Sequence, residues 1–451
     1  MKSSILTRSL SVLAILAFFS SARSLGSQVV APEKLAEIEK AIEAEMAATK
    51  TPGAAVAVIS GDKVVFAKGF GTTSAEGGSA VTADTLFRMG STTKMFTAAA
   101  VLTLSEAGKV KMSVPVGSYL KGLPTKVSSL TLHQLLSQSS GLRDFNPLAS
   151  GHDDAILGQN IRLWKDDVFF TEPDTIYSYS SANYWLAGYV SEEIYGKPYA
   201  DTLAELVLRP LGMNRSAVRP FDAMTFPLSL GHSISNGAVS VVRPIDNNAG
   251  KYPGGSMYSN INELSRFAVA ILNAGKVDGK QAIAASVVEE LQRPQFYLPG
   301  EEKAFYGYGL LGYDDSGVKT VSHGGVSRGY GSTIFFAPEQ KLAVIVLANS
   351  NGQTLPRSRR KVMELLLPLV QQKPSPPPTG AIDLSKFTGT FTHAPQSWNL
   401  SVRDGQLYVE SEGKSARLVP SGPEEFTSDL GQFLFVKDKQ GNYQHIFMGL
   451  Y

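Results

Sequence analysis

The chain has 451 residues, of which 43% are hydrophobic, and its 42 Lys and Arg nearly balance its 40 Asp and Glu. This composition excludes an intrinsically disordered chain, and the near-neutral charge gives no electrostatic footprint for nucleic acid. With no cysteine, the sequence excludes disulfides, thiol nucleophiles and cysteine-based metal sites. Its six histidines are scattered without metal-ligand spacing, so we predict no structural metal and no cofactor.

The start of the chain has the pattern of a secretory signal peptide. Lys2 and Arg8 are followed by an apolar run at 10–19 and by small residues at 20–22. The apolar run is too short to span a bilayer, which needs about 20 residues. We therefore predict that residues 1–22 are removed and that the mature protein is periplasmic or secreted, without a stable membrane span.

Residues 31–370 read as one mixed domain. It starts with a helix from Pro32 and a hairpin made by Ala55–Ile59 and Val64–Ala67. Helices are predicted in the middle of the domain at 91–107, 132–137, 183–195, 201–208 and 262–272. Strands are then predicted at 306–313, 320–322, 332–336 and 342–347, and a closing helix at 357–370. Short turns between neighbouring strands predict an antiparallel sheet flanked by helices, in the α+β class.

The end of the chain has a different character. Residues 371–380 form a proline-rich linker that includes the run 376–378. Residues 381–451 alternate polar and apolar side chains around turn signals at Asp404-Gly405 and Gly441-Asn442. We predict a small all-β domain here.

Ser91 and Lys94 are the first candidates for chemistry. Their spacing at the start of a predicted helix puts a hydroxyl and an amine on one face, one turn apart. The helix N-terminus favours negative charge developing near the serine, and a desolvated lysine can accept the serine proton. The same spacing recurs elsewhere in polar turns, so the spacing by itself is a weak signal.

An ordered set of segments resembles the serine β-lactamase and penicillin-binding protein superfamily, most closely its class C β-lactamase, D-aminopeptidase and family-S12 esterase branch. The segments are FRMGSTTKMFTA (87–98), LLSQSSGL (135–142), YSYSSANY (177–184), GGS (254–256), NELSRF (262–267) and HGG (323–325). The resemblance covers roughly residues 31–370. Gln138 stands where histidine is commoner, Ser181 where β-lactamases have asparagine, and His323 where they have lysine.

The resemblance implies catalytic roles. Ser91 would be the nucleophile, Lys94 and Tyr179 would carry its proton, and the backbone N–H groups of Ser91 and Val326 would form the oxyanion hole. Gly325 would let the substrate lie edge-on against the strand.

Two further residues are implied to meet the substrate, Ser181 and His323. A protonated His323 would also add positive charge near Tyr179. A hydroxyl offers fewer hydrogen bonds than an amide, and a histidine is only partly charged at neutral pH. These departures therefore weaken the case for efficient penicillin hydrolysis and favour esters, amides or D-amino-acid peptides.

Ser327 is a rival nucleophile, because 325–329 fits the Gly-x-Ser-x-Gly pattern of α/β-hydrolases. That pattern needs a strand before the serine and a helix after it. The residues that follow here, through 334–336, predict a strand and a turn. We therefore interpret Ser327 as a loop residue.

Together these observations predict an exported serine hydrolase of β-lactamase, DD-peptidase or esterase type, which forms an acyl-enzyme at Ser91. Its expected partner is a small-molecule or peptide acyl substrate, with peptidoglycan fragments a candidate because of export. The alternative is a slowly acylated or inactive penicillin-binding or cell-wall-sensing module on the same fold. The tail resembles the lipocalin-like additions of some relatives, and its removal should change substrate preference if it shapes the cleft.

Overall fold

The computed structural model describes residues 30–300, 303–370, 382–393, 396–437 and 441–448. Two predicted segments lie outside these residues, the signal peptide (1–22) and the proline-rich linker (371–380).

The centre of the large domain is an eight-stranded antiparallel sheet with the order β2-β1-β14-β13-β12-β11-β10-β9. It joins the two ends of the domain, because β1 pairs with β14, with Ala54 opposite Ala348. The strands are β1 (Gly53–Ser60), β2 (Lys63–Gly71), β9 (Phe296–Tyr297), β10 (Phe305–Tyr306), β11 (Leu311–Asp315), β12 (Val318–Ser327), β13 (Tyr330–Ala337) and β14 (Leu342–Ala348). The predicted antiparallel sheet is confirmed.

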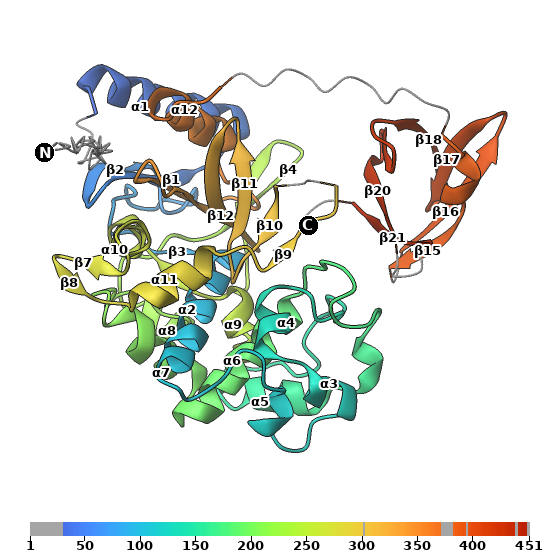
Figure 1. The fold of residues 1–451 in the computed structure, drawn as a ribbon. Coiled ribbons are helices and arrows are strands. Elements are labelled where there is room, and N and C mark those ends of the chain that lie inside the picture. Colours follow the sequence, from blue (N-terminus) through green and yellow to red (C-terminus); the bar gives the residue numbers. More distant parts are fainter. Residues whose placement is uncertain (1–29, 301–302, 371–381, 394–395, 438–440, 449–451) are drawn as a thin grey trace, which may run out of the picture.

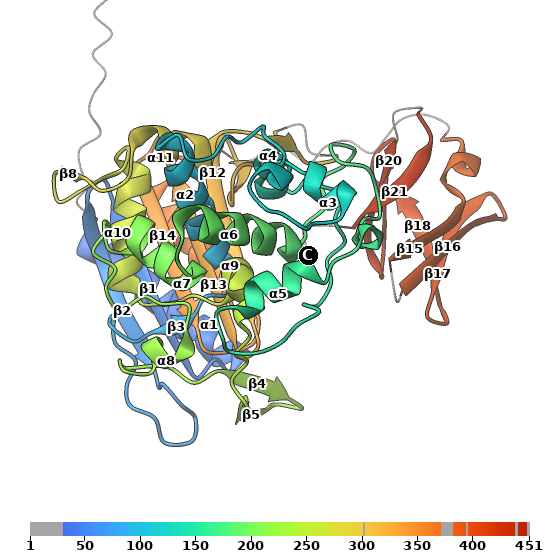
Figure 2. The same ribbon diagram turned by 90° about the horizontal axis from the view of Figure 1, so that it is seen from below.

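Helices bury both faces of this sheet, as Figures 1 and 2 show. Helices α1 (Pro32–Thr49) and α12 (Pro356–Leu366) pack together on one face. Alternate residues of β1 point to opposite sides, with Val56 on the side of α1 and Ala57 on the side of the helical region. Two-sided burial explains why β1, β13 and β14 are buried throughout their length.

The helical region covers the other face. Its helices are α2 (Thr93–Glu106), α3 (Thr125–Ser129), α4 (Leu132–Leu136), α5 (Ile156–Arg162), α6 (Ser181–Tyr195), α7 (Tyr199–Leu203), α8 (Pro220–Ala223), α9 (Tyr252–Gly255), α10 (Ile261–Leu272) and α11 (Ala285–Gln292). The Asn260 side chain accepts a hydrogen bond from Glu263 N and caps α10. Short strand pairs β3–β6 (Phe87–Arg88 with Tyr258–Ser259), β4–β5 (His232–Ser235 with Ala238–Val241) and β7–β8 (Lys276–Val277 with Lys280–Gln281) complete the domain.

Several predicted elements have different bounds, and for two of them the local cause is clear. The single strand predicted at 306–313 is divided into β10 and β11, because Gly307 N bonds Leu310 O in a turn where Gly309 has a φ of +77°. The closing helix ends at Leu366 rather than at 370. Leu367 precedes Pro368, which disfavours the helical conformation at that residue, and its ψ is 149°.

The C-terminal domain is a seven-stranded antiparallel sheet in simple sequential order. Its strands are β15 (Gly389–His393), β16 (Gln396–Arg403), β17 (Gln406–Ser411), β18 (Lys414–Pro420), β19 (Glu425–Ser428), β20 (Gly431–Lys437) and β21 (Tyr443–Phe447). Aromatic residues such as Phe387, Phe426 and Phe435 fill its interior. Contacts between β15 and β21 make the sheet nearly closed, a near-barrel.

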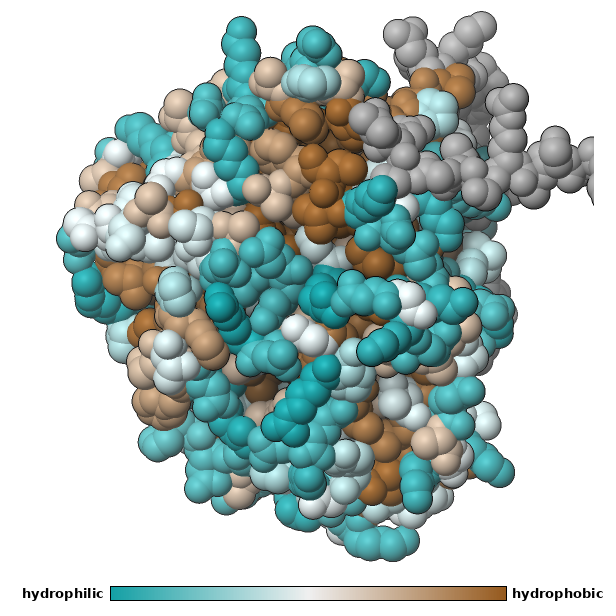
Figure 3. Space-filling model, turned by 90° about the vertical axis from the view of Figure 1, so that its left-hand side faces the viewer, coloured by the Kyte–Doolittle hydropathy of each residue, from teal (hydrophilic) through white to brown (hydrophobic). Residues whose placement is uncertain are grey.

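On the face at the left-hand side of Figure 1, hydrophilic side chains separate the areas of hydrophobic ones (Figure 3). In the part of the chain that the structure describes, no helix combines the length and the hydropathy needed to cross a membrane.

Candidate active site

Ser91 lies where the helical region meets the sheet. It belongs to a 3-10 turn, Gly90–Thr92, that continues directly into α2. Gly90 has a φ of +56°, and a Cβ there would lie 2.5 Å from the carbonyl oxygen of Val326. Glycine is therefore required for the turn to approach the end of β12 this closely, which brings the backbone of Ser91 beside that of Val326.

Lys94 lies one turn further along and is completely buried. Its Nζ donates hydrogen bonds to Ser91 Oγ at 3.2 Å, to Gly254 O at 2.7 Å and to Ser181 Oγ at 3.4 Å. Burial lowers the pKa of Lys94 to about 7, because desolvation penalises the ammonium form, while the charge of Asp144 acts in the opposite direction. Near neutral pH a large share of Lys94 is therefore a neutral amine, which can accept the proton of Ser91.

Tyr179 lies over this lysine, with Lys94 Nζ 4.8 Å from the centre of its ring. The segment around Tyr179 is held by Gln138, which has a φ of +61°. The backbone oxygen of Gln138 accepts from Ser178 N at 2.9 Å, and its side-chain oxygen accepts from Ser180 N at 2.9 Å. Two of the motifs found in the sequence are thus one structural unit, in which Gln138 fixes the residues on both sides of Tyr179.

Ser181 begins α6 and faces the same centre. Its N–H donates to Asp144 Oδ1 at 2.8 Å, and its hydroxyl accepts from Lys94. Asp144 is exposed in the loop after the Gln138 segment. Sequence reasoning missed Asp144, because a lone exposed aspartate in a loop carries no pattern.

The far wall is β12, which presents Val326 to the cleft with 58% of its surface exposed. Gly325 has a different role from the one expected. A Cβ there would lie 1.9 Å from Met89 O and 2.5 Å from Thr92 Oγ1, which belong to the segment that carries Ser91. Gly325 therefore allows the turn that carries the nucleophile to pack against the strand, while its predicted contact with the substrate stays a prediction.

His323 also needs a correction. Its side chain is completely buried. Its Nε2 forms a hydrogen bond with the Tyr306 hydroxyl at 3.2 Å, and its Nδ1 forms one with the backbone oxygen of the next residue, Gly324, at 2.5 Å. Burial and the nearby charge of Lys94 lower the pKa of His323 to about 3. His323 is therefore neutral at physiological pH, and it neither supplies positive charge to Tyr179 nor lines the cleft pocket.

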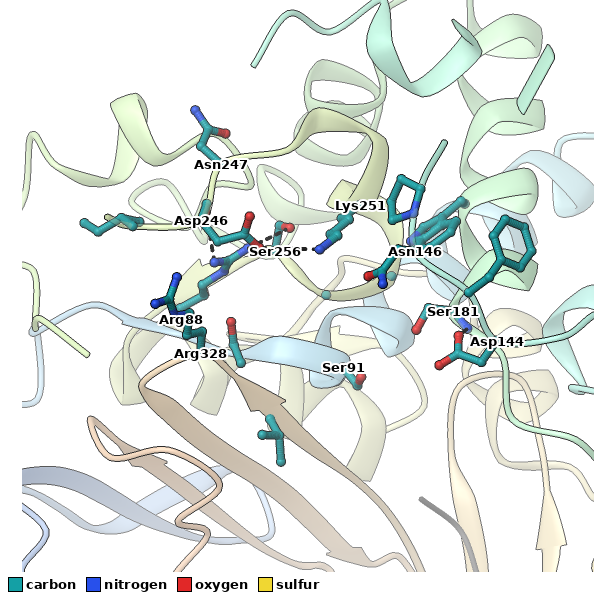
Figure 4. A pocket seen from close by; sticks show the side chains of 18 of the residues that line it. Arg88, Ser91, Asp144, Asn146, Ser181, Asp246, Asn247, Lys251, Ser256 and Arg328 are labelled. Atoms are coloured by element: carbon teal, nitrogen blue, oxygen red, sulfur yellow. Dashed lines mark hydrogen bonds and ion pairs between the residues drawn. The ribbon is translucent and has the colours of Figure 1, made fainter. Parts of the chain in front are cut away.

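Ser91 opens into a cavity of about 700 Å³ (Figure 4). Ser91 lies near its middle, Ser181 and Asp144 lie at one end, and Arg88 and Arg328 lie at the other. Phe145, Asn146, Trp185, Ile245, Asp246, Lys251, Ser256 and Val326 are among the other lining residues. The cavity is large enough for a small acyl substrate.

Ser327 also borders this cavity, but its backbone does not form a nucleophile elbow. It is the last residue of β12, and the chain turns directly into β13. A hairpin stands in place of the strand–turn–helix that an elbow requires. The prediction that Ser327 lies in a loop is wrong, because Ser327 pairs with Tyr330 as the last residue of the strand.

Two curated proteins are similar to this chain over about two thirds of its length. Penicillin-binding protein 4 of Amycolatopsis lactamdurans is 28% identical over 319 residues, which cover 67% of this chain and 82% of that protein. Protein flp of Staphylococcus aureus strain N315 is 24% identical over 332 residues, or 71% of this chain, and the chain spans 64% of that protein's length.

Solved structures share the fold. The octameric penicillin-binding protein homologue from Pyrococcus abyssi matches with a TM-score of 0.66 and 23% identity, covering 90% of this chain and 96% of that one. SurE matches with a TM-score of 0.75 and 19% identity, covering 92% and 98%. The model of the family described as Beta-lactamase matches residues 38–367. The chain therefore belongs to the Beta-lactamase family.

Proposed function

We propose that this protein is an exported serine acyl hydrolase that works through an acyl-enzyme at Ser91. One observation carries the proposal: a buried lysine, with its pKa lowered to about 7, lies 3.2 Å from a serine hydroxyl at the floor of a cleft. A serine is a weak nucleophile unless a base removes its proton, and a neutral amine at this distance is such a base.

In the acylation step, the proton of Ser91 Oγ moves to the neutral Nζ of Lys94 while Oγ bonds to the substrate's carbonyl carbon. The electron pair of the carbonyl moves onto its oxygen, which accepts hydrogen bonds from the N–H groups of Ser91 and Val326. When the tetrahedral intermediate collapses, the bond to the leaving group breaks, and the leaving group takes the proton from Lys94. The products are a Ser91 ester and a neutral lysine.

Water then attacks the Ser91 ester. Its proton passes to the Lys94–Tyr179 pair and is returned to Ser91 Oγ as the carboxylic acid leaves. The position of the Tyr179 ring over Lys94 supports a shared role for the two residues in moving this proton.

The substrate class we propose is esters, amides or D-amino-acid peptides, ahead of penicillins. The neutral state of His323 supports this choice, because β-lactamases have a lysine at this position that gives a penicillin carboxylate a fixed charge, and His323 gives none. A structure of SurE, which shares only the fold, was solved with D-Leu, and D-amino-acid compounds are therefore reasonable first substrates.

The test is intact-protein mass over time after mixing with benzylpenicillin or with an activated N-acetyl-D-alanyl ester, followed by peptide mapping. We expect an adduct on Ser91 and its loss in Ser91→Ala, with activity reduced by about 10³-fold or more. Ser327→Ala borders the same cavity and is the matched control, which should keep both adduct and turnover. Full activity in Ser91→Ala would overturn the proposal, and an adduct that is never released would favour the penicillin-binding or sensing module instead.

A further inference from the structure

The cavity at Ser91 has an uneven distribution of charge. Three cationic side chains, Arg88, Lys251 and Arg328, line it together with Asp246, while the other lining carboxylate, Asp144, lies at the opposite end beside Ser181 (Figure 4). Three cations and one carboxylate line the cationic end, which therefore has a local excess of positive charge in the same cavity as Ser91.

Asp246 is shared between two of these cations. Arg88 is almost completely buried and donates to Asp246 O at 2.9 Å and to Ser256 Oγ at 3.2 Å, with the Asp246 carboxylate 3.5 Å away. Lys251 lies 3.8 Å from the same carboxylate. Arg88 Nε is buried without a hydrogen-bond partner among the described residues. A buried guanidinium with an unused donor is costly unless a further acceptor completes it.

Arg328 is the third cation at this end of the cavity. It lies in the turn after β12, two residues beyond Val326, and is exposed to the cavity. Within the described ranges, no carboxylate lies at ion-pair distance from Arg328. A guanidinium presents several donors in a planar fork, which matches the two oxygens of a carboxylate.

We propose that this end of the cavity, formed by Arg88, Lys251 and Arg328, is an anion subsite that binds a carboxylate of the substrate, with Arg328 as its direct contact. The inference rests on the proposed function and narrows its substrate class to acyl compounds that carry a carboxylate some distance from the reacting carbonyl. It also assigns the substrate's negative charge to a loop arginine, since the buried, neutral His323 cannot bind it.

Three thioesters test the subsite, with thiol release as the readout. N-acetyl-D-alanyl methyl thioglycolate is neutral, the N-succinyl analogue carries a carboxylate on the acyl side, and the free thioglycolate carries one on the leaving side. We expect kcat/KM to be about tenfold higher for one of the two carboxylated thioesters than for the neutral one, and the preferred thioester shows on which side of the reacting carbonyl the subsite lies. Arg328→Gln should bring the ratio of kcat/KM between the carboxylated and the neutral thioester to about one, whatever its effect on the absolute rates, and raising the salt concentration should weaken the preference of the wild-type protein.

Arg360→Gln is the matched control, because Arg360 is exposed on α12, where it pairs with Glu364. That variant should keep the preference. Equal kcat/KM for all three thioesters, or a preference that survives in Arg328→Gln, would overturn the subsite while leaving the proposed function intact. If no thioester is turned over, the proposed function fails. In that case, calorimetry compares the affinities of the wild-type and Arg328→Gln proteins for N-succinyl-D-alanine and for the neutral N-acetyl-D-alaninamide. Tighter binding of the carboxylated compound that is lost in Arg328→Gln would support the subsite, and equal binding would overturn it.

Discussion

At the scale of single residues, the proposed chemistry depends on whether the Lys94 amine is neutral or protonated. Lys94 would be an ordinary ammonium group if it were exposed, and it could not then accept a proton from Ser91. Its complete burial, with Gly254 O and two hydroxyls as hydrogen-bond partners, makes the neutral amine accessible near pH 7. The same burial keeps His323 neutral, so one desolvated region controls both groups.

The lowered pKa of Lys94 predicts the pH dependence of acylation. The neutral amine is the active form, and it is lost as the pH falls through about 7. The second-order rate of Ser91 acylation should therefore fall about tenfold per pH unit below that value and reach a plateau above it. Stopped-flow measurements with an activated ester would give the profile, and a rate independent of pH from 5 to about 8 would contradict Lys94 as the base.

A substitution checks the same point. Lys94→Arg keeps a positive charge but cannot become neutral, so acylation should slow by about 10²-fold or more. Lys109→Arg, at an exposed position after α2, is the matched control and should retain the wild-type rate.

At the scale of elements, the site is assembled by loops that hold one another. The sequence indicates Gln138 and the Tyr179 segment as two separate motifs, and the structure joins them through hydrogen bonds to Ser178 and Ser180. Sequence patterns indicated the helices, the strands and the Ser91–Lys94 spacing because these depend on neighbours in the chain. The contacts between loops depend on residues about 40 positions apart, which no local pattern contains.

Replacing Gln138 tests this arrangement. Gln138→Leu removes the acceptor of Ser180 N and of the Asn183 amide, which are both buried. We expect a loss of about 1–3 kcal/mol in the free energy of unfolding. Because the Tyr179 segment loses its anchor, kcat should fall more than KM rises.

Urea denaturation and steady-state kinetics, measured well below the melting temperature, give both quantities. Gln159→Leu, at an exposed position of α5, is the matched control. An unchanged kcat in Gln138→Leu would mean that Gln138 stabilises the fold without positioning Tyr179.

At the scale of the whole molecule, the C-terminal domain reaches the wall of the active site. Phe447 at the end of β21 packs edge-on against Tyr177, with the ring centres 6.1 Å apart, in a cluster that also includes Tyr179 and Tyr306. His445 lies edge-on to Phe170, a partly exposed residue of the large domain. Figure 1 shows this domain beside the β9–β11 edge of the large sheet. Its aromatic contacts make it a candidate for shaping the cleft.

Phe447→Ala tests that role. The lost aromatic contact should cost only about 0.5–1.5 kcal/mol, so the protein should remain folded. We expect the ratio of kcat/KM between a bulky and a small leaving group to change severalfold. Phe221→Ala removes an exposed phenylalanine elsewhere and should leave the ratio unchanged. An unchanged ratio in Phe447→Ala would show that the C-terminal domain packs beside the site without shaping it.

The sequence by itself determined the longer helices and the central strands of the large domain, the antiparallel character of its sheet and the spacing of Ser91 and Lys94, because periodicity, turn residues and helical spacing are local properties. Only the tertiary structure decided the protonation states of Lys94 and His323, the reason for glycine at 325 and the exposure of Arg328 to the cavity. Each of these depends on which distant residues exclude water from a group or leave it exposed, and burial is a property of the packed chain rather than of any segment.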